Sequence, residues 1–134
     1  MKQTFVVDIS YDSQYKILSD YVGKPQCECN MEILLRKDQR ANIGDIVFFR
    51  CLHYWYKGIA AKGLVEEVVD QNCVDVRFTI LINPEEHPFL SFSELEEVLP
   101  NKNWKDRYSD IRLDADEAQI LNDKWDMYLE KNKI

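Results

Sequence analysis

Glycine and proline are scarce in this chain, with four of each among 134 residues. This scarcity argues against a disordered segment or a long linker, and the length suits a single domain, residues 1–134, with its own core. No apolar run approaches the 18 residues that a membrane-spanning helix needs. An acidic residue as early as Asp8 also disfavours a secretory signal. We therefore expect a cytoplasmic protein that makes no membrane contact.

Recognised catalytic motifs are missing as well. The sequence holds no nucleophile elbow, no phosphate-binding glycine loop, no zinc-protease helix and no dinucleotide-binding fingerprint. Cys27-Glu28-Cys29 is a lone C-x-C pair, and neither His53 nor His87 is well placed to complete a zinc site. We expect no catalytic residue, no metal and no cofactor. A small hydrolase using a cysteine or a histidine is the last of three functional hypotheses.

Positive charge is in short supply. The chain has 17 Lys and Arg against 24 Asp and Glu, a net charge of −7, of which residues 84–134 carry −6. An acidic protein lacks the counterion-release drive that dominates non-specific nucleic-acid binding. Nucleic-acid contact would then need a specific pocket or a local basic face. Scattered solubilising charge is the alternative interpretation of the cations in the first half: Lys16, Lys24, Arg36, Lys37, Arg40, Arg50, Lys57 and Lys62.

Apolar runs and alternation predict the strands. Thr4–Ile9 is apolar on both faces, which favours a central strand. Ile46–Cys51, Gly58–Val69 and Val74–Ile82 read as a meander, because the last two are joined by the short connection Asp70-Gln71-Asn72. Residues 74–82 alternate apolar and polar side chains, so one face of that strand is buried and the other is wet.

Helices are indicated by caps and by helical spacing. Asp12 or Ser13 can begin a short helix to about Tyr21, whereas Met31–Leu35 fits either a strand or a helical turn. Ser91 and Ser93 each stand three residues before a glutamate and can cap a short helix that Pro100 closes. A last helix begins at an Asp114 cap, and its apolar stripe would cover the sheet: Ala118, Leu121, Trp125, Tyr128 and Leu129.

Two groups of aromatic residues lie outside the predicted elements. Tyr54, Trp55 and Tyr56 connect two strands, and Trp104 and Tyr108 precede the last helix. Planar bases stack on aromatic faces, and methylated or cationic groups also favour aromatic walls. The alternative is that these rings plug the end of a small barrel, because large aromatic side chains often serve the core.

Several segments together resemble the EVE-type branch of the PUA-like superfamily. The first is a Gly-Asp turn and strand, Ile43–Phe49 (IGDIVFF), followed by a strand with a Gly-Ile-x-x-x-Gly-x-Val rhythm at 57–68 (KGIAAKGLVEEV). The later segments are PFLSFSEL at 88–95, a tryptophan at 104, YSDIRL at 108–113 and an acid-capped last helix. The resemblance covers roughly residues 43–130, and Phe5–Ile9 would be the usual first strand.

The resemblance implies both a fold and a function. The fold would be α+β: a small, strongly curved or closed antiparallel β-barrel of about five or six strands with flanking helices. Many members of the superfamily hold a modified base of DNA or RNA in a pocket between barrel and loops, so the resemblance implies a non-catalytic reader of a modified base or nucleotide. Its ligand-binding residues would be the stacking walls Tyr54, Trp55 and Trp104, the polar contacts Tyr108, Ser109 and Asp110, and the phosphate contacts Arg50 and Lys57.

A second hypothesis uses the acidic half of the chain. Glu85, Glu86, Glu94, Glu96 and Glu97 lie close together in the sequence. Such a cluster can imitate the charge of a nucleic acid and so attract a basic protein. The alternative function is therefore an acidic protein-interaction module, for example an inhibitor, acting on a protein partner.

Overall fold

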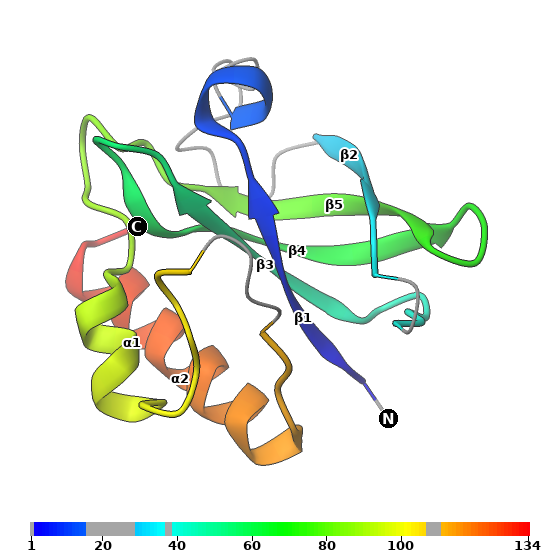
Figure 1. Ribbon diagram of the computed structural model, residues 1–134. Helices are drawn as coiled ribbons and strands as arrows, with labels where there is room; N and C mark the ends of the chain where they lie inside the picture. Colours follow the sequence, from blue (N-terminus) through cyan, green and yellow to red (C-terminus); the bar gives the residue numbers. More distant parts are fainter. Residues whose placement is uncertain (1, 16–28, 37–38, 107–110) are drawn as a thin grey trace.

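The computed structural model of the protein describes residues 2–15, 29–36, 39–106 and 111–134 (Figure 1). Five strands form one sheet: β1 (Thr4–Ile9), β2 (Asn30–Leu34), β3 (Ile46–Leu52), β4 (Lys57–Val68) and β5 (Cys73–Leu81). A single π-helical turn, η1 (Tyr11–Tyr15), follows β1, and two α-helices, α1 (Phe92–Val98) and α2 (Ala115–Lys131), come last. Neither α-helix in the described ranges combines the length and apolar character of a membrane crossing.

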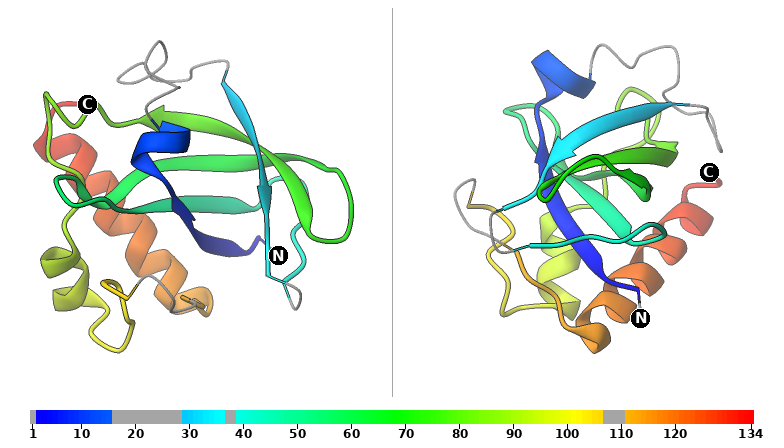
Figure 2. Two further views of the ribbon diagram at one scale, coloured as in Figure 1. Left: turned by 45° about the horizontal axis from the view of Figure 1, so that its top comes forward. Right: turned by 90° about the vertical axis from the view of Figure 1, so that its right-hand side faces the viewer.

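The sheet is a curled half-barrel with the strand order β1-β3-β4-β5-β2. The strands β3, β4 and β5 pair antiparallel, so the predicted meander is confirmed. The two edge strands, β1 and β2, face one another across the open side of the curled sheet (Figure 2). The predicted small, strongly curved β-fold with flanking helices is therefore confirmed.

Strand β1 differs from expectation in two respects. It pairs parallel to β3, in register from Thr4 beside Ile46 to Ile9 beside Cys51, so the sheet is mixed and not wholly antiparallel. It also lies at an edge of the sheet and not in its centre. Both faces of the neighbouring strand β3 are covered, and β1 lies beside β3. Both faces of β1 are therefore partly covered as well, which explains why both are apolar.

The core has two layers because successive residues of β3 point to opposite faces. Phe48 meets Trp125 of α2 edge-on with ring centroids 5.8 Å apart, while Phe49 meets Phe78 of β5 on the inner side at 4.8 Å. Helices α1 and α2 both lie below the sheet in Figure 1. The inner layer fills the half-barrel, and the outer layer joins the sheet to its helices.

The helix caps follow the predicted chemistry. The Ser91 hydroxyl accepts the backbone N–H of Glu94 and begins α1, so Ser91, and not Ser93, is the cap that is used. At α2 the Asp114 carboxylate and the Glu117 side chain cap each other's backbone N–H groups, a complete capping box. Buried Leu121, Trp125 and Tyr128 confirm the predicted stripe.

Gly58 lets the segment before α1 approach the sheet. Its φ is +139°, and a Cβ there would lie 2.3 Å from the carbonyl oxygen of Leu90. Two hydrogen bonds use this approach: Ile59 N–H to Leu90 O at 2.9 Å and Leu90 N–H to Ile59 O at 3.2 Å. The glycine therefore fixes where α1 begins relative to the β3–β4 hairpin.

Gly58→Ala should lower the free energy of unfolding. The left-handed backbone alone costs about 1–3 kcal/mol for a residue with a Cβ, and the displaced Leu90 carbonyl adds to that cost. Gly44→Ala is the matched control, because Gly44 also has a positive φ, +91°, but its Cβ would meet only the Lys2 side chain at 4.0 Å. Urea midpoints that rank the two variants equal would contradict this role of Gly58.

Candidate functional site

The hairpin that joins β3 to β4 carries two exposed aromatic rings. Residues 53–56, here called the aromatic loop, include Tyr54 and Trp55, whose relative exposures are 77% and 76%. The two rings stand at 89° to each other with centroids 4.8 Å apart. They form a corner that is open to solvent, as a stacking site requires.

A second set of rings braces the aromatic loop from below. The His53 ring stacks on Tyr56 at 5.7 Å, and Tyr11 of η1 lies 4.8 Å from His53 and 4.7 Å from Tyr56. His53 Nδ1 accepts the backbone N–H of Trp55 at 3.2 Å, and its Nε2 lies 3.5 Å from a carboxylate oxygen of Asp12. The loop is thereby tied to η1.

Sequence analysis missed this bracing role of Tyr11 and His53. The two residues are 42 positions apart in the sequence, and no spacing rule brings them together. Burial, helped by the neighbouring Tyr56 phenol, raises the pKa of Tyr11 above its usual range. The Tyr11 phenol therefore stays protonated to a higher pH than a phenol in water, and a protonated phenol can donate a hydrogen bond.

Trp104 does not join the stacking surface. Its side chain is completely buried, and its indole N–H donates to the carbonyl of Leu99 at 3.1 Å. The ring fills the space behind the end of α1, because a side chain of that size gains most by leaving water altogether. The prediction of Trp104 as an aromatic wall is wrong.

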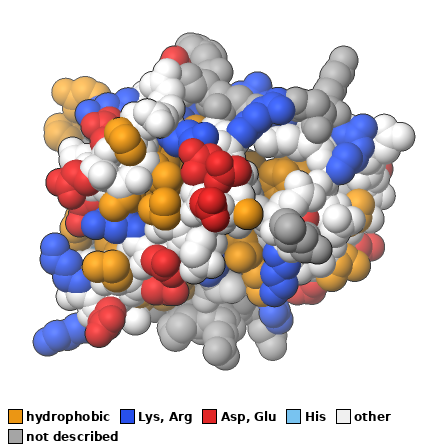
Figure 3. Space-filling model, turned by 90° about the horizontal axis from the view of Figure 1, so that it is seen from below, with side chains coloured by type: hydrophobic (Ala, Val, Ile, Leu, Met, Phe, Trp, Pro, Cys, Tyr) orange, Lys and Arg blue, Asp and Glu red, His pale blue; other side chains and the backbone are white. Residues whose placement is uncertain are grey.

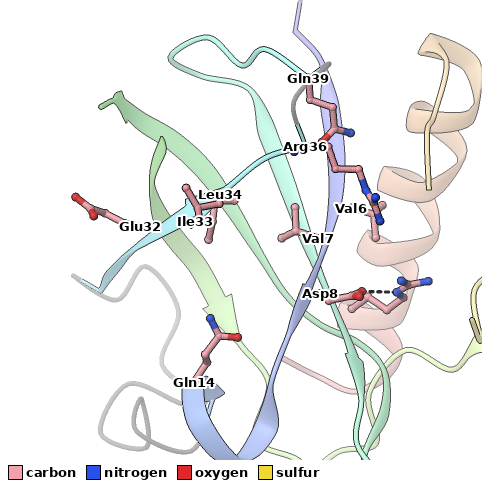
Figure 4. Close-up of a pocket in the computed structure, with 10 residues that line it drawn as sticks. Val6, Val7, Asp8, Gln14, Glu32, Ile33, Leu34, Arg36 and Gln39 are labelled. Carbon is pink, nitrogen blue, oxygen red and sulfur yellow. Dashed lines mark hydrogen bonds and ion pairs between the residues drawn. The ribbon is translucent and has the colours of Figure 1, made fainter. Parts of the chain in front are cut away.

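Arg50 is used inside the protein and does not hold phosphate. Only 3% of its side chain is exposed. Its Nε donates to a carboxylate oxygen of Asp8 at 2.6 Å, and its Nη1 donates to the carbonyls of Asn103 and Trp104 at 3.2 Å each. Figure 4 shows the pairing with Asp8. The guanidinium thus fastens β1 and β3 to the segment after α1, which corrects the predicted role.

The remaining predicted residues divide between two cases. Lys57 begins β4, is exposed, and lies beside the aromatic loop. Tyr108, Ser109 and Asp110 lie outside the described residues, so their contacts with a ligand stay predictions. Within the part of the chain that the structure describes, no three His, Cys, Asp or Glu side chains are grouped closely enough to hold a metal ion.

Three hollows that share lining residues follow the outer edge of β1, and together they are called the β1 groove. The middle hollow, of about 450 Å³, lies between β1 and β2, with Val7, Ile33 and Leu34 among its lining residues (Figure 4). A hollow of about 420 Å³ shares Asp8, Gln14 and Arg50 with it and reaches His53. A third, of about 270 Å³, shares Gln39 and reaches the start of β1.

Basic residues gather at one end of the β1 groove. Arg36 lines the middle hollow together with Glu32, and Lys2, Arg40 and Arg112 line the hollow at the start of β1 together with Asp114. The opposite end, below the aromatic loop, is lined by Asp8 and Asp12. The groove therefore runs from a cationic end to the base of the exposed aromatic corner.

Comparison with known proteins finds chains of similar fold but does not establish a function. No family model matches the chain, and neither does any curated protein. A solved structure of a hypothetical protein from Leishmania major is similar, with a TM-score of 0.62, 16% identity, and coverage of 95% of this chain and 97% of that one. The ASCH structure from Zymomonas mobilis is also similar, with a TM-score of 0.55, 10% identity, and coverage of 90% and 94%.

The curled half-barrel and its likeness to ASCH show a PUA-like fold. Identities of 16% and 10% carry the fold and no more. The narrower EVE-type assignment stays a prediction.

Proposed function

We propose that this chain is a non-catalytic module that binds single-stranded nucleic acid and stacks one unpaired, modified base on the aromatic loop. The observation that carries the proposal is the corner made by Tyr54 and Trp55, each more than three-quarters exposed on a braced loop. Leaving two large rings in water forgoes burial energy that a bound partner can supply. Base–aromatic stacking contributes about 1–3 kcal/mol per base.

The β1 groove supports the path of the strand. Its cationic end is lined by Lys2, Arg36, Arg40 and Arg112, whose positive charge attracts phosphates, although the chain as a whole is acidic. Its other end lies beneath the aromatic loop, at His53. An extended strand that follows the groove would pass Asp8 and Asp12 before it reaches the stacking corner. With few cations engaged, we expect a modest salt dependence.

The preference for a modified base follows from the chemistry of the corner. Because the two rings are perpendicular, a bound base can contact the face of one ring and the edge of the other. A methyl group adds apolar area to the stacked base, and a methyl on a ring nitrogen can add a positive charge that an aromatic face attracts. A methylated base should therefore bind more tightly than the plain base, and a base in a duplex should bind least.

Fluorescence anisotropy with short labelled oligonucleotides tests this function. Single-stranded RNA and DNA of one sequence, each plain or with one central methylated base, would be compared with their duplexes. The proposal expects saturable binding of a single strand, strengthened by the methyl group. Absence of saturation up to about 100 μM protein, the weak limit of non-specific binding, would reject it.

The acidic protein-interaction module is the second candidate, and two ion pairs bear on it. Glu94 lies 4.0 Å from the ammonium of Lys124, and Glu96 lies 3.4 Å from that of Lys105. Figure 3 shows acidic side chains interspersed with basic and apolar ones on the face seen from below. A nucleic-acid mimic needs a continuous surface of one sign, so the nucleic-acid proposal has more support.

A further inference from the structure

A fourth hollow lies against the stem of the aromatic loop, on the side of α1. It has a volume of about 370 Å³ and is lined by Leu52, Lys57, Phe92 and Lys105; it is called the lysine pocket. Leu52 and Lys57 face each other across the β3–β4 hairpin. Leu52 also lines the β1 groove, so the stem of the aromatic loop separates the two hollows.

Buried contacts place both walls of the lysine pocket. The Gly58–Leu90 approach fixes the segment that leads into Phe92, whose side chain is buried. The Arg50 bonds to the carbonyls of Asn103 and Trp104 hold the backbone just before Lys105. The backbones at Lys57 and Lys105, from distant parts of the sequence, are thus brought to one hollow by buried contacts beside them.

The chemistry of the lysine pocket suits one anionic group. Its lining combines two lysines with Leu52 and Phe92, so a charged head and an adjoining apolar body can be accommodated together. Lys105 makes an exposed ion pair with Glu96 at 3.4 Å, with 63% of its side chain exposed. Exposed ion pairs contribute at most about 1 kcal/mol, so Lys105 can exchange this carboxylate for a phosphate at little cost.

We infer that the lysine pocket is a phosphate subsite, which holds the phosphate next to the base stacked on Trp55. This inference rests on the proposed function. Lys57 is two residues from Trp55 in the sequence, so one nucleotide can contact both. Lys105 takes the role that the sequence alone assigned to Arg50. The base is then selected by the aromatic loop, and the backbone is positioned by the two lysines.

The salt dependence of oligonucleotide binding tests the inference. Each phosphate contact in a single strand contributes about 0.7 to the slope of log K against log salt concentration. Lys57→Gln and Lys105→Gln should therefore each make the slope shallower by up to about 0.7. Arg77→Gln is the matched control, because Arg77 is also an exposed cation, 53% exposed, in an exposed pair with Glu66 at 3.3 Å. Arg77 pairs with Leu64, which is seven residues after Lys57 on β4, so Arg77 lies about 20 Å from Lys57.

The outcomes separate the two claims. A shallower slope for both lysine variants, with the slope of Arg77→Gln equal to wild type, supports the phosphate subsite. Wild-type binding with unchanged slopes in both lysine variants overturns the subsite and leaves the proposed function standing. Equal loss of slope in all three variants also overturns it, since the charge effect would then be general. Absence of oligonucleotide binding by the wild-type protein rejects the proposed function and the subsite with it.

Discussion

Replacing Arg50 with alanine should lower the free energy of unfolding by about 2–4 kcal/mol, because two carbonyls lose a buried donor and each such loss costs about 1–3 kcal/mol. The substitution removes the partner of Asp8 and leaves the carbonyls of Asn103 and Trp104 without their donor from Nη1. The side chain is 3% exposed, so water does not replace these bonds easily. Urea denaturation monitored by circular dichroism measures the loss.

Two controls show whether burial is the cause. Arg77→Ala removes an exposed arginine from an exposed pair with Glu66, and it should cost no more than about 1 kcal/mol. Asp8→Asn keeps an oxygen acceptor for Arg50 and changes a side chain that is 44% exposed, so its effect should fall between the two. If Arg50→Ala cost no more than Arg77→Ala, the structural role assigned to Arg50 would be wrong.

Removing both exposed rings should weaken nucleic-acid binding strongly. The double variant Tyr54→Ala/Trp55→Ala is expected to lose about 2 kcal/mol of binding free energy, roughly 30-fold in Kd, because stacking is lost. The unfolding free energy should stay close to wild type, since the two side chains are 77% and 76% exposed. Anisotropy titration with the tightest-binding oligonucleotide measures the change.

Met127→Ala provides the matched control for the double variant. Met127 is another exposed apolar side chain, 62% exposed, but it belongs to α2 and not to the aromatic loop. Its replacement should leave Kd unchanged. Equal weakening by Met127→Ala would mean that exposed apolar area in general, and not the aromatic corner, attracts the oligonucleotide.

Local sequence patterns predicted most elements but not how the first strand pairs. The alternation of residues 74–82 and the caps at Ser91 and Asp114 depend on neighbours in the sequence, and the structure confirms them. Whether Thr4–Ile9 lies at the edge or the centre depends on pairing with β3, 42 residues away. An apolar strand is compatible with either position, so its sequence does not distinguish them.

The site was predictable where exposure follows from a short hairpin loop. Tyr54 and Trp55 lie on the short loop that joins two buried strands, and their side chains stay exposed. Trp104 also lies outside regular structure, but the space behind α1 buries it completely. Sequence does not reveal such a space, and it does not show that Arg50 meets Asp8 on the neighbouring strand.

Acrylamide quenching of tryptophan emission shows whether a bound base covers the indole of Trp55. Trp55 is exposed, whereas Trp104 and Trp125 are 0% and 1% exposed, so quenching in the free protein reports on the aromatic loop. With a single strand bound at saturation, the account predicts that the quenching constant falls towards the value for buried tryptophan, because a base covers the indole. An unchanged quenching constant, while anisotropy shows the oligonucleotide bound, would contradict stacking on the aromatic loop.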